Sequence, residues 1–176
     1  MGLSCLASQH IWLLWKSKKT VSRITFEHCI FTACEDALTI GFKTRDITFR
    51  NCIFLSNPDG RYRDKIIQLN HADRVRFFDC YVAPTKNGVE FKSGANIYAE
   101  RCFFDHCSTA WRVRTGDDYR GIVPDQPTRL RSKNCTYRFA KQAFYLEGTV
   151  TAESIGDLFP GSRKVVTKRG ALFRHR

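Results

Sequence analysis

Two pairs of charged residues, with the members of each pair two positions apart, indicate a site for negatively charged ligands. Glu90 and Lys92 lie in the segment NGVEFK, and Arg112 and Arg114 lie in the segment AWRVR. Residues two apart in a β-strand project from the same face, so each pair shares a face if these segments are strands. Like charges gathered on a rigid sheet cost energy unless a counter-anion is present. The pattern therefore predicts a surface that binds anionic groups.

These pairs belong to a series of similar segments that we expect to stack as neighbouring strands. The segments span residues 36–40, 65–69, 87–91, 110–114 and 143–147. Their alignment predicts two inward apolar columns, Leu38, Ile67, Val89, Trp111 and Phe144, and Ile40, Leu69, Phe91, Val113 and Leu146. Alternation then turns the intervening residues outward. The candidate substrate-binding residues on that outer face are Thr39, Gln68, Asn70, Glu90, Arg112, Arg114 and Tyr145.

Such an outer face suits a sugar chain. Its amide and charged groups can bind hydroxyls and carboxylates, and the ring of Tyr145 offers a surface on which a pyranose can stack. The alternative is an ordinary solvated face, because most exposed strand faces are polar. Both interpretations remain open on the sequence alone.

A repeated motif with a cysteine at a fixed place precedes these segments. RITFEHCIF at 23–31 returns as DITFRNCIF at 46–54. Three weaker copies follow, and the five aligned cysteines are Cys29, Cys52, Cys80, Cys102 and Cys135. We expect them to form one buried column, because Cys is a small apolar residue that packs against its own kind. The alternatives are metal ligation or disulfides. The polar residue before each Cys predicts a bend in left-handed backbone geometry.

Short strands that recur about every 22 residues without intervening helices are typical of a solenoid of β-strands. The predicted fold class is all-β, a right-handed parallel β-helix of about five coils. Within the 176 residues we expect three parts: a possible cap at 1–20, the β-helix at 21–148 and a basic C-terminal tail at 149–176. Leucine-rich repeats have similar periods, but their regular Leu spacing is absent.

The formal net charge of +12 favours an anionic partner, either an acidic polysaccharide, a nucleic acid or a membrane surface. The longest apolar run, IWLLW, is too short to span a membrane, and we expect no membrane association. No export signal is recognisable at the N-terminus, which leaves the localisation open. An end-to-end oligomer or a partner chain that completes the coils is a further expectation.

From the motifs ITFEHC with DALTI, ITFRNCIF with DKIIQLN, and VRFFDCYV with NGVEFKSGANIYAERCFF, the chain resembles the pectate lyase family over roughly residues 22–139. Members of that family are right-handed parallel β-helices that cleave polygalacturonate by β-elimination. The resemblance implies secretion, an acidic polysaccharide substrate and a calcium cofactor. The family's two active-site arginines would fall near Thr85 and Glu90, so this part of its pattern is not matched.

The resemblance also implies site residues. Lys65 matches a substrate-contacting lysine, and Lys86 and Lys92 lie near the positions of the missing arginines, so these three are the candidate catalytic residues. The candidate calcium ligands are Asp36, Glu35 and Asp64. Calcium prefers several converging oxygen ligands, which carboxylates supply.

Three functions follow from these observations. The first is a lyase-like protein that binds or cleaves uronate polysaccharide. The second is a non-catalytic β-helix that binds anionic glycans, as in a tailspike or adhesin module, and the missing arginines favour it over a complete enzyme. The third, a basic nucleic-acid binder, is the least favoured because only the net charge supports it.

Overall fold

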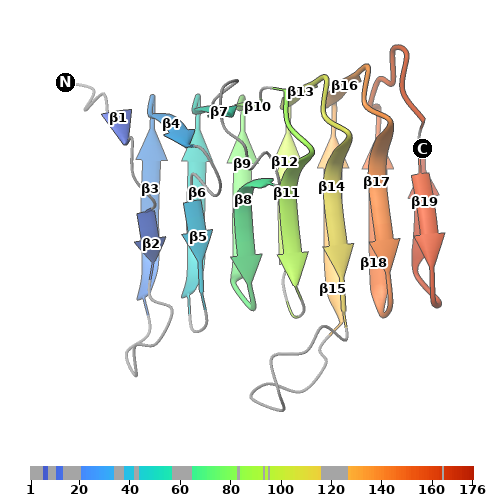
Figure 1. The fold of residues 1–176 in the computed structure, drawn as a ribbon. Helices are drawn as coiled ribbons and strands as arrows, with labels where there is room; N and C mark the ends of the chain where they lie inside the picture. Colours follow the sequence, from blue (N-terminus) through green and yellow to red (C-terminus); the bar gives the residue numbers. More distant parts are fainter. Residues whose placement is uncertain are drawn as a thin grey trace.

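The protein is an all-β chain in three parallel sheets. The computed structural model describes residues 6–7, 11–13, 21–33, 38–41, 44–56, 65–82, 84–92, 94, 96–115, 127–163 and 165–176. These residues form twenty strands, β1 to β20, and they contain no helix (Figure 1). This agrees with the all-β class predicted from the sequence.

All strand pairs within the three sheets are parallel. Sheet A contains β1 (Leu6–Ala7), β4 (Ile30–Ala33), β7 (Ile53–Ser56), β10 (Tyr81–Val82), β13 (Phe103–Asp105) and β16 (Thr136–Arg138). Sheet B contains β2 (Ile11–Leu13), β5 (Leu38–Ile40), β8 (Lys65–Asn70), β11 (Asn87–Lys92), β14 (Thr109–Arg114), β17 (Gln142–Glu147) and β19 (Val165–Lys168). Sheet C contains β3 (Val21–Glu27), β6 (Thr44–Arg50), β9 (Asp73–Phe78), β12 (Asn96–Glu100), β15 (Thr128–Lys133), β18 (Val150–Ile155) and β20 (Leu172–His175).

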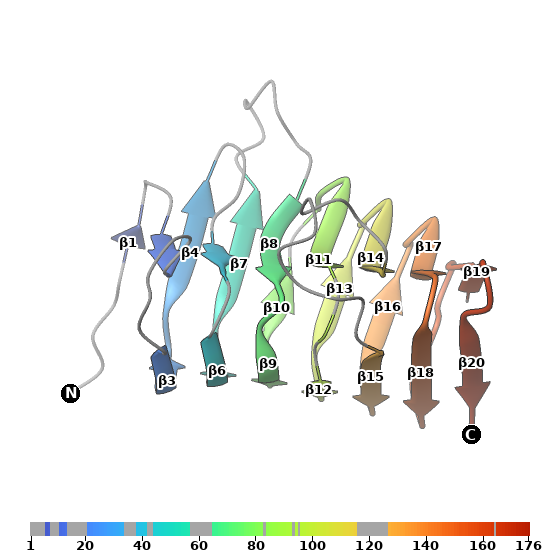
Figure 2. The same ribbon diagram turned by 90° about the horizontal axis from the view of Figure 1, so that it is seen from below.

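The chain visits the sheets in the fixed order C, A, B, and we call one such passage a coil. The complete coils are β3–β5, β6–β8, β9–β11, β12–β14 and β15–β17. Sheets B and C form opposite walls of the molecule, and their strands run in opposite directions (Figures 1 and 2). This arrangement is compatible with a parallel β-helix.

The strands extend beyond the predicted limits of 21 and 148. At the C-terminal side, β18 pairs with β15, β19 with β17, and β20 with β18. The expected basic tail at 149–176 therefore contributes strands to sheets B and C. At the N-terminal side, β1 and β2 pair with β4 and β5.

The residue before each column cysteine adopts the predicted left-handed backbone. The φ angles lie between 50° and 54° at five positions, His28, Asn51, Asp79, Arg101 and Asn134. An L-residue in this region costs about 1–2 kcal/mol. The backbone offsets that cost, because the N–H of Asn51, for example, donates to the carbonyl of Phe78 in the next coil at 3.0 Å. The bend turns the chain from sheet C into sheet A.

The five cysteines form the predicted buried column. The N–H groups that follow Cys52 and Cys80 donate to the carbonyls of Cys29 and Cys52, both at 2.9 Å, so the column repeats coil by coil. All of the described cysteines are free thiols, which excludes disulfides among them. Cys107, predicted at a turn, is also buried, and burial raises the pKa of its thiol to about 12. Cys5 and Cys34 lie outside the described residues.

Aromatic ladders fill the interior. Phe26, Phe49 and Phe77 of successive coils stack with ring centroids 5.1 and 5.0 Å apart. Phe31 and Phe54 stack in the same way at 4.9 Å. Full burial of one such side chain stabilises the fold by about 1.5–3 kcal/mol. The ladders therefore hold consecutive coils in register.

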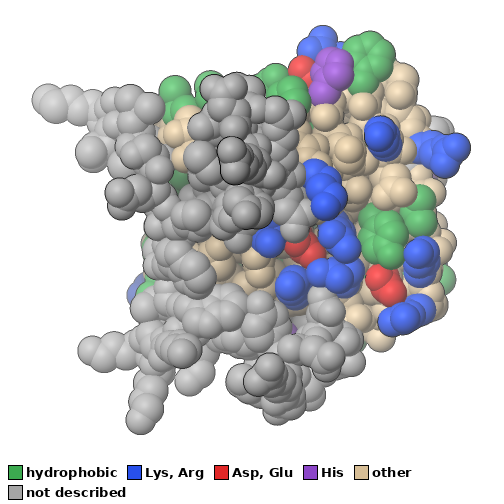
Figure 3. Space-filling view, viewed as in Figure 1, with side chains coloured by type: hydrophobic (Ala, Val, Ile, Leu, Met, Phe, Trp, Pro, Cys, Tyr) green, Lys and Arg blue, Asp and Glu red, His purple; other side chains and the backbone are tan. Residues whose placement is uncertain are grey.

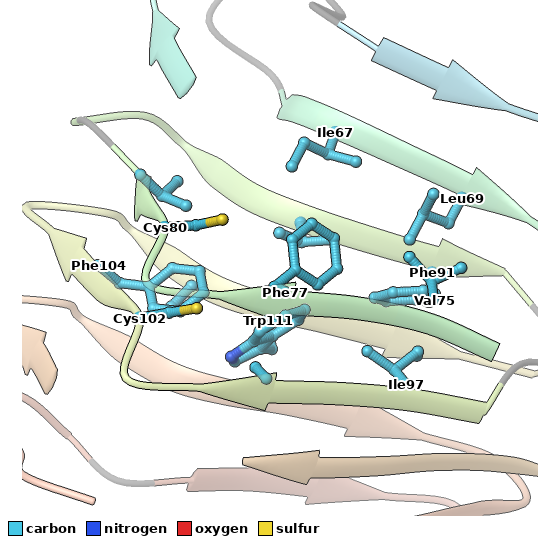
Figure 4. Packing of buried hydrophobic residues seen from close by; sticks show 14 of the residues in the cluster. Ile67, Leu69, Val75, Phe77, Cys80, Phe91, Ile97, Cys102, Phe104 and Trp111 are labelled. Atoms are coloured by element: carbon cyan, nitrogen blue, oxygen red, sulfur yellow. The ribbon is translucent and has the colours of Figure 1, made fainter. Parts of the chain in front are cut away.

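Trp111 of β14 joins the three sheets at the centre. Its ring lies 5.8 Å from Phe77 of sheet C and 5.0 Å from Phe104 of sheet A. Its indole N–H donates to the buried Tyr137 hydroxyl at 2.9 Å. Figure 4 shows Trp111, Phe77 and Phe104 pointing toward one another from the three sheets.

Candidate functional site

The predicted outer columns of sheet B are confirmed by the strand register. Thr39, Gln68, Glu90, Arg112 and Tyr145 are successive register partners. A second column follows two residues further along each strand and contains Asn70, Lys92, Arg114, Glu147 and Lys168. The two predicted inward columns are likewise in register, and all their members are buried.

The exposure of this face differs from the sequence-based expectation. Thr39, Gln68, Asn70 and Glu90 point away from the apolar interior, yet each is buried, and Glu90 is only 2% exposed. Alternation predicts the direction of a side chain but not whether another part of the protein covers it. The exposed part of the face therefore begins at β11 and β14, where the side chains of Arg112 and Arg114 are 30% and 21% exposed.

Glu90 is a buried carboxylate beside the exposed arginines. Its Oε1 accepts a hydrogen bond from Arg114 Nη2 at 2.5 Å and lies 3.9 Å from Arg112 Nε. Half-buried Lys92 adjoins Arg114 in the register. Two arginines thus approach Glu90, and the two columns together hold four cations, Lys92, Arg112, Arg114 and Lys168, against the two carboxylates Glu90 and Glu147. Figure 3 shows Lys and Arg side chains gathered around acidic ones on this face.

Tyr145 carries two further cation contacts. The guanidinium carbon of Arg112 lies 5.9 Å and Lys168 Nζ lies 5.4 Å from the centre of its ring. The Tyr145 hydroxyl donates to Glu147 Oε2 at 3.2 Å, which fixes the ring. Lys168 was missed from sequence because its segment was assigned to a tail. The apolar pair Val165 and Val166 before it is the signal that could have identified the strand.

Amide groups line the buried part of the face. Gln68 Nε2 donates to Asn70 Oδ1 at 3.0 Å. Within the described part of the chain, Asn70 Nδ2 and Thr39 Oγ1 have no hydrogen-bond partner. A buried donor left without a partner costs about 1–3 kcal/mol. These atoms retain hydrogen-bonding capacity beside the cations.

The three candidate catalytic lysines lie in two places. Lys65 begins β8 and is the register partner of Asn87, so Lys86 lies just before the strand of the next coil, at the same end of sheet B. Lys92 ends β11, five positions beyond Asn87, which is about 17 Å along the strand. The structure therefore places Lys65 and Lys86 at one end of sheet B and Lys92 at the other end, with Arg112 and Arg114.

The candidate calcium ligands Glu35, Asp36 and Asp64 lie outside the described residues. In the described part of the chain, no group of three or more His, Cys, Asp or Glu side chains could hold a metal ion. The calcium site remains a prediction from the resemblance.

Comparisons with protein-family models, with curated proteins and with solved structures find no match to this chain. No helix among the described residues is long and apolar enough to cross a membrane. The geometry of the site therefore carries the functional argument.

Proposed function

We propose that the strands wind as a right-handed parallel β-helix and that the outer face of sheet B binds an acidic polysaccharide rich in uronates. Parallel pairing in all three sheets and the repeated order C, A, B support the fold, since crossovers between parallel strands are almost always right-handed. The observation that carries the function is the charge of the two outer columns, in which Lys92, Arg112, Arg114 and Lys168 outnumber Glu90 and Glu147.

Each part of this face has a partner in a uronate chain. A guanidinium binds a carboxylate through two parallel hydrogen bonds, and an ammonium group binds it as a point charge. Sugar hydroxyls both donate and accept, so they can bind the partly exposed Tyr145 hydroxyl and Glu147 carboxylate. A phosphodiester group offers acceptors only, so it would meet the Glu147 carboxylate as a like charge without a donor for it.

Cleavage by β-elimination is the activity proposed for the same face. A base removes the proton at C5 of a uronate, the electron pair forms the C4–C5 double bond, and the glycosidic oxygen at C4 leaves. Lys65 and Lys86 favour this function, because both lie at the start of neighbouring strands of sheet B. One of them must be deprotonated to act as the base.

The binding test uses polygalacturonate with the variant K92T/R112T. Threonine preserves strand propensity, so the variant removes two charges from the face and little else. We expect affinity to fall about tenfold or more, the loss typical of removed charge-assisted hydrogen bonds. The matched control is K141T/R163T, which removes one exposed lysine and one exposed arginine elsewhere. Equal affinity for the two variants would contradict the proposal.

The activity test follows the ultraviolet absorbance of unsaturated uronate product in the presence of calcium. The lyase proposal predicts a signal that K65A and K86A abolish. Binding without product at any calcium concentration would leave a non-catalytic glycan-binding protein. Binding to single-stranded DNA but not to polygalacturonate, with steep dependence on salt, would replace both with a nucleic-acid-binding function.

A further inference from the structure

A groove of about 360 Å³ crosses the outer face of sheet C, on the wall opposite sheet B. It runs over β9, β12, β15 and β18. The lining residues that matter are Arg74, Arg76, Tyr98, Arg129, Arg131 and Glu153. Four cations thus face one carboxylate, and none of these residues belongs to the sheet B site.

The cations of the groove differ in how far they are neutralised. Arg74 forms a two-bond ion pair with Asp46, at 2.6 and 2.8 Å, and also contacts Asp73 at 3.1 Å. Arg131 Nε lies 3.3 Å from Glu153 Oε2. Arg76, in contrast, is exposed and forms no ion pair with any described residue.

Arg129 is the second exposed guanidinium without an ion pair to the described part of the chain. Glu153, the acid nearest to it in the groove lining, is already shared between Arg131 and Arg176, the latter at 2.8 Å. The groove therefore keeps a positive charge that its own carboxylates do not balance. Exposed, uncompensated cations in a concave surface attract an anionic ligand.

The register gives the cations a regular geometry. Arg76, Tyr98 and Arg131 are partners in successive coils, and Arg129 is the partner of Asn96. Adjacent coils are about 4.8 Å apart and residues two apart in a strand about 6.6 Å. A chain laid along the stack of coils would therefore meet Arg76, then Tyr98 and Asn96, then Arg129 and Arg131.

We propose that this groove is a second polysaccharide-binding site, which takes an extended glycan carrying carboxylates or sulfates. Its anionic groups pair with Arg76 and Arg129. Its hydroxyls bind the polar groups of Asn96, Thr151 and Glu153. The proposal does not depend on the sheet B site. If both sites bind, their positions on opposite walls make the protein a cross-linker of glycan chains.

Two features favour a glycan over a single-stranded nucleic acid. Platforms for nucleic acids stack successive bases on several aromatic rings. The groove lining has one ring, that of Tyr98, whose hydroxyl donates to Glu100 Oε2 at 2.9 Å. Glu153 also lines the groove, and its carboxylate can accept a further hydrogen bond from a sugar hydroxyl but would repel a phosphodiester of like charge.

The test titrates the full chain calorimetrically with a galacturonate decamer, a sulfated glycan oligomer, a neutral glucan and oligo(dT). We expect the variant R76T/R129T to lose one class of binding sites for the charged glycans, with affinity there at least about tenfold weaker. The neighbouring residues Thr25 and Thr48 are the register partners of Arg76 in earlier coils, so threonine fits the column. The control K141T/R163T removes the same charge and should keep both classes.

The outcomes separate this proposal from the previous one. K92T/R112T should lose the other class of sites and keep the one that depends on Arg76 and Arg129. R76K/R129K, which keeps the charge but not the planar fork, should bind with intermediate affinity. The proposal fails if R76T/R129T binds both charged glycans like the control. It also fails if the arginines govern binding of oligo(dT) more strongly than of either glycan.

Discussion

The outer faces of sheets B and C both gather cations around carboxylates, but the two faces differ in how deeply these carboxylates are buried. On sheet B, the side chain of Glu90 is 3% exposed and is held by two arginines. On sheet C, the side chain of Glu153 is 24% exposed, and that of its partner Arg131 is 57% exposed. Pairs of arginine and glutamate thus occur on both sheets, with a buried carboxylate on sheet B and a partly exposed one on sheet C.

This difference in burial distinguishes charged residues that stabilise the fold from charged residues that are available to bind a ligand. A buried carboxylate cannot be left without its cations, so the arginines around Glu90 serve the fold as well as any ligand. An exposed ion pair contributes little to stability, about 0–1 kcal/mol. The cations of sheet C are therefore free to serve binding alone. The following changes test that distinction, from the largest expected effect to the smallest.

Replacing Trp111 with alanine should destabilise the outer faces of sheets B and C together, because both sheets pack on the interior that Trp111 fills. The change removes the largest fully buried side chain and leaves the Tyr137 hydroxyl without its indole donor. We expect a loss of about 3–5 kcal/mol in the free energy of unfolding, measured by urea denaturation. W111F, which keeps a ring, should lose less. Equal losses for the two variants would contradict the assignment of Trp111 to a packed centre.

Glu90 provides the direct comparison with Glu153. E90Q should lower the free energy of unfolding by about 2 kcal/mol, less than for a fully buried pair because both arginines reach solvent. E153Q is the matched change on sheet C, and its loss should stay below about 1 kcal/mol. Urea denaturation of both variants at neutral pH gives the comparison. A larger loss for E153Q than for E90Q would contradict the expectation that the more deeply buried carboxylate contributes more to stability.

Asp105 on sheet A is an intermediate case, because its carboxylate is buried but its partner Arg138 is 44% exposed. The hydrogen bonds from Arg138 lower the pKa of Asp105 from 3.8 to about 2. A folded-state pKa below the unfolded value stabilises the fold above about pH 4, and this contribution is lost as the pH falls toward 2.

D105N should therefore destabilise the protein by about 1 kcal/mol at pH 7, after allowance for the solvent around Arg138. At pH 2 its unfolding midpoint should approach that of the unchanged protein. Urea titrations at the two pH values measure the difference. A loss that is the same at both values would assign the effect of D105N to packing instead of charge.

The smallest effect is expected from D46N on sheet C. Arg74 lowers the pKa of Asp46 through its two hydrogen bonds, but the carboxylate is exposed to solvent. Solvent screening leaves little net stabilisation, so the thermal unfolding midpoint should not change measurably. A shift as large as that of E90Q would show that exposed pairs on this face are stronger than the comparison assumes.

The repeated pattern predicted much of the fold because a stack of parallel strands repeats its local rules in every coil. The column of Cys29 and Cys52 and the bends at Asn51 and Asp79 follow from residue types alone. The strand at 150–155 escaped prediction because Asp157 stands where the motif has its cysteine, and the strand at 165–168 fell in the expected basic tail. Asp157 follows β18 and accepts the N–H of Cys135 at 2.7 Å, so a carboxylate ends the column.

The sequence predicted which residues belong to the candidate site, but not how exposed they are or which groups they contact. Alternation assigned Gln68, Glu90 and Arg112 to one outward column, and the register agrees. Alternation did not predict that Glu90 is buried or that Lys168 approaches Tyr145, because these two features depend on contacts with segments distant in sequence. The groove on sheet C was also not predicted, since Arg76 and Arg129 come to line one groove only through the stacking of coils.

The amino-acid sequence by itself determined the strand periodicity, the inward apolar columns and the left-handed bend before each column cysteine. These are local properties, in which one residue type and its immediate neighbours fix direction and backbone geometry. Only the tertiary structure decided which charges are buried, which are paired and which remain exposed on two opposite walls. Those properties depend on solvent access and on distances between coils, and neither is encoded in the spacing of residues along one strand.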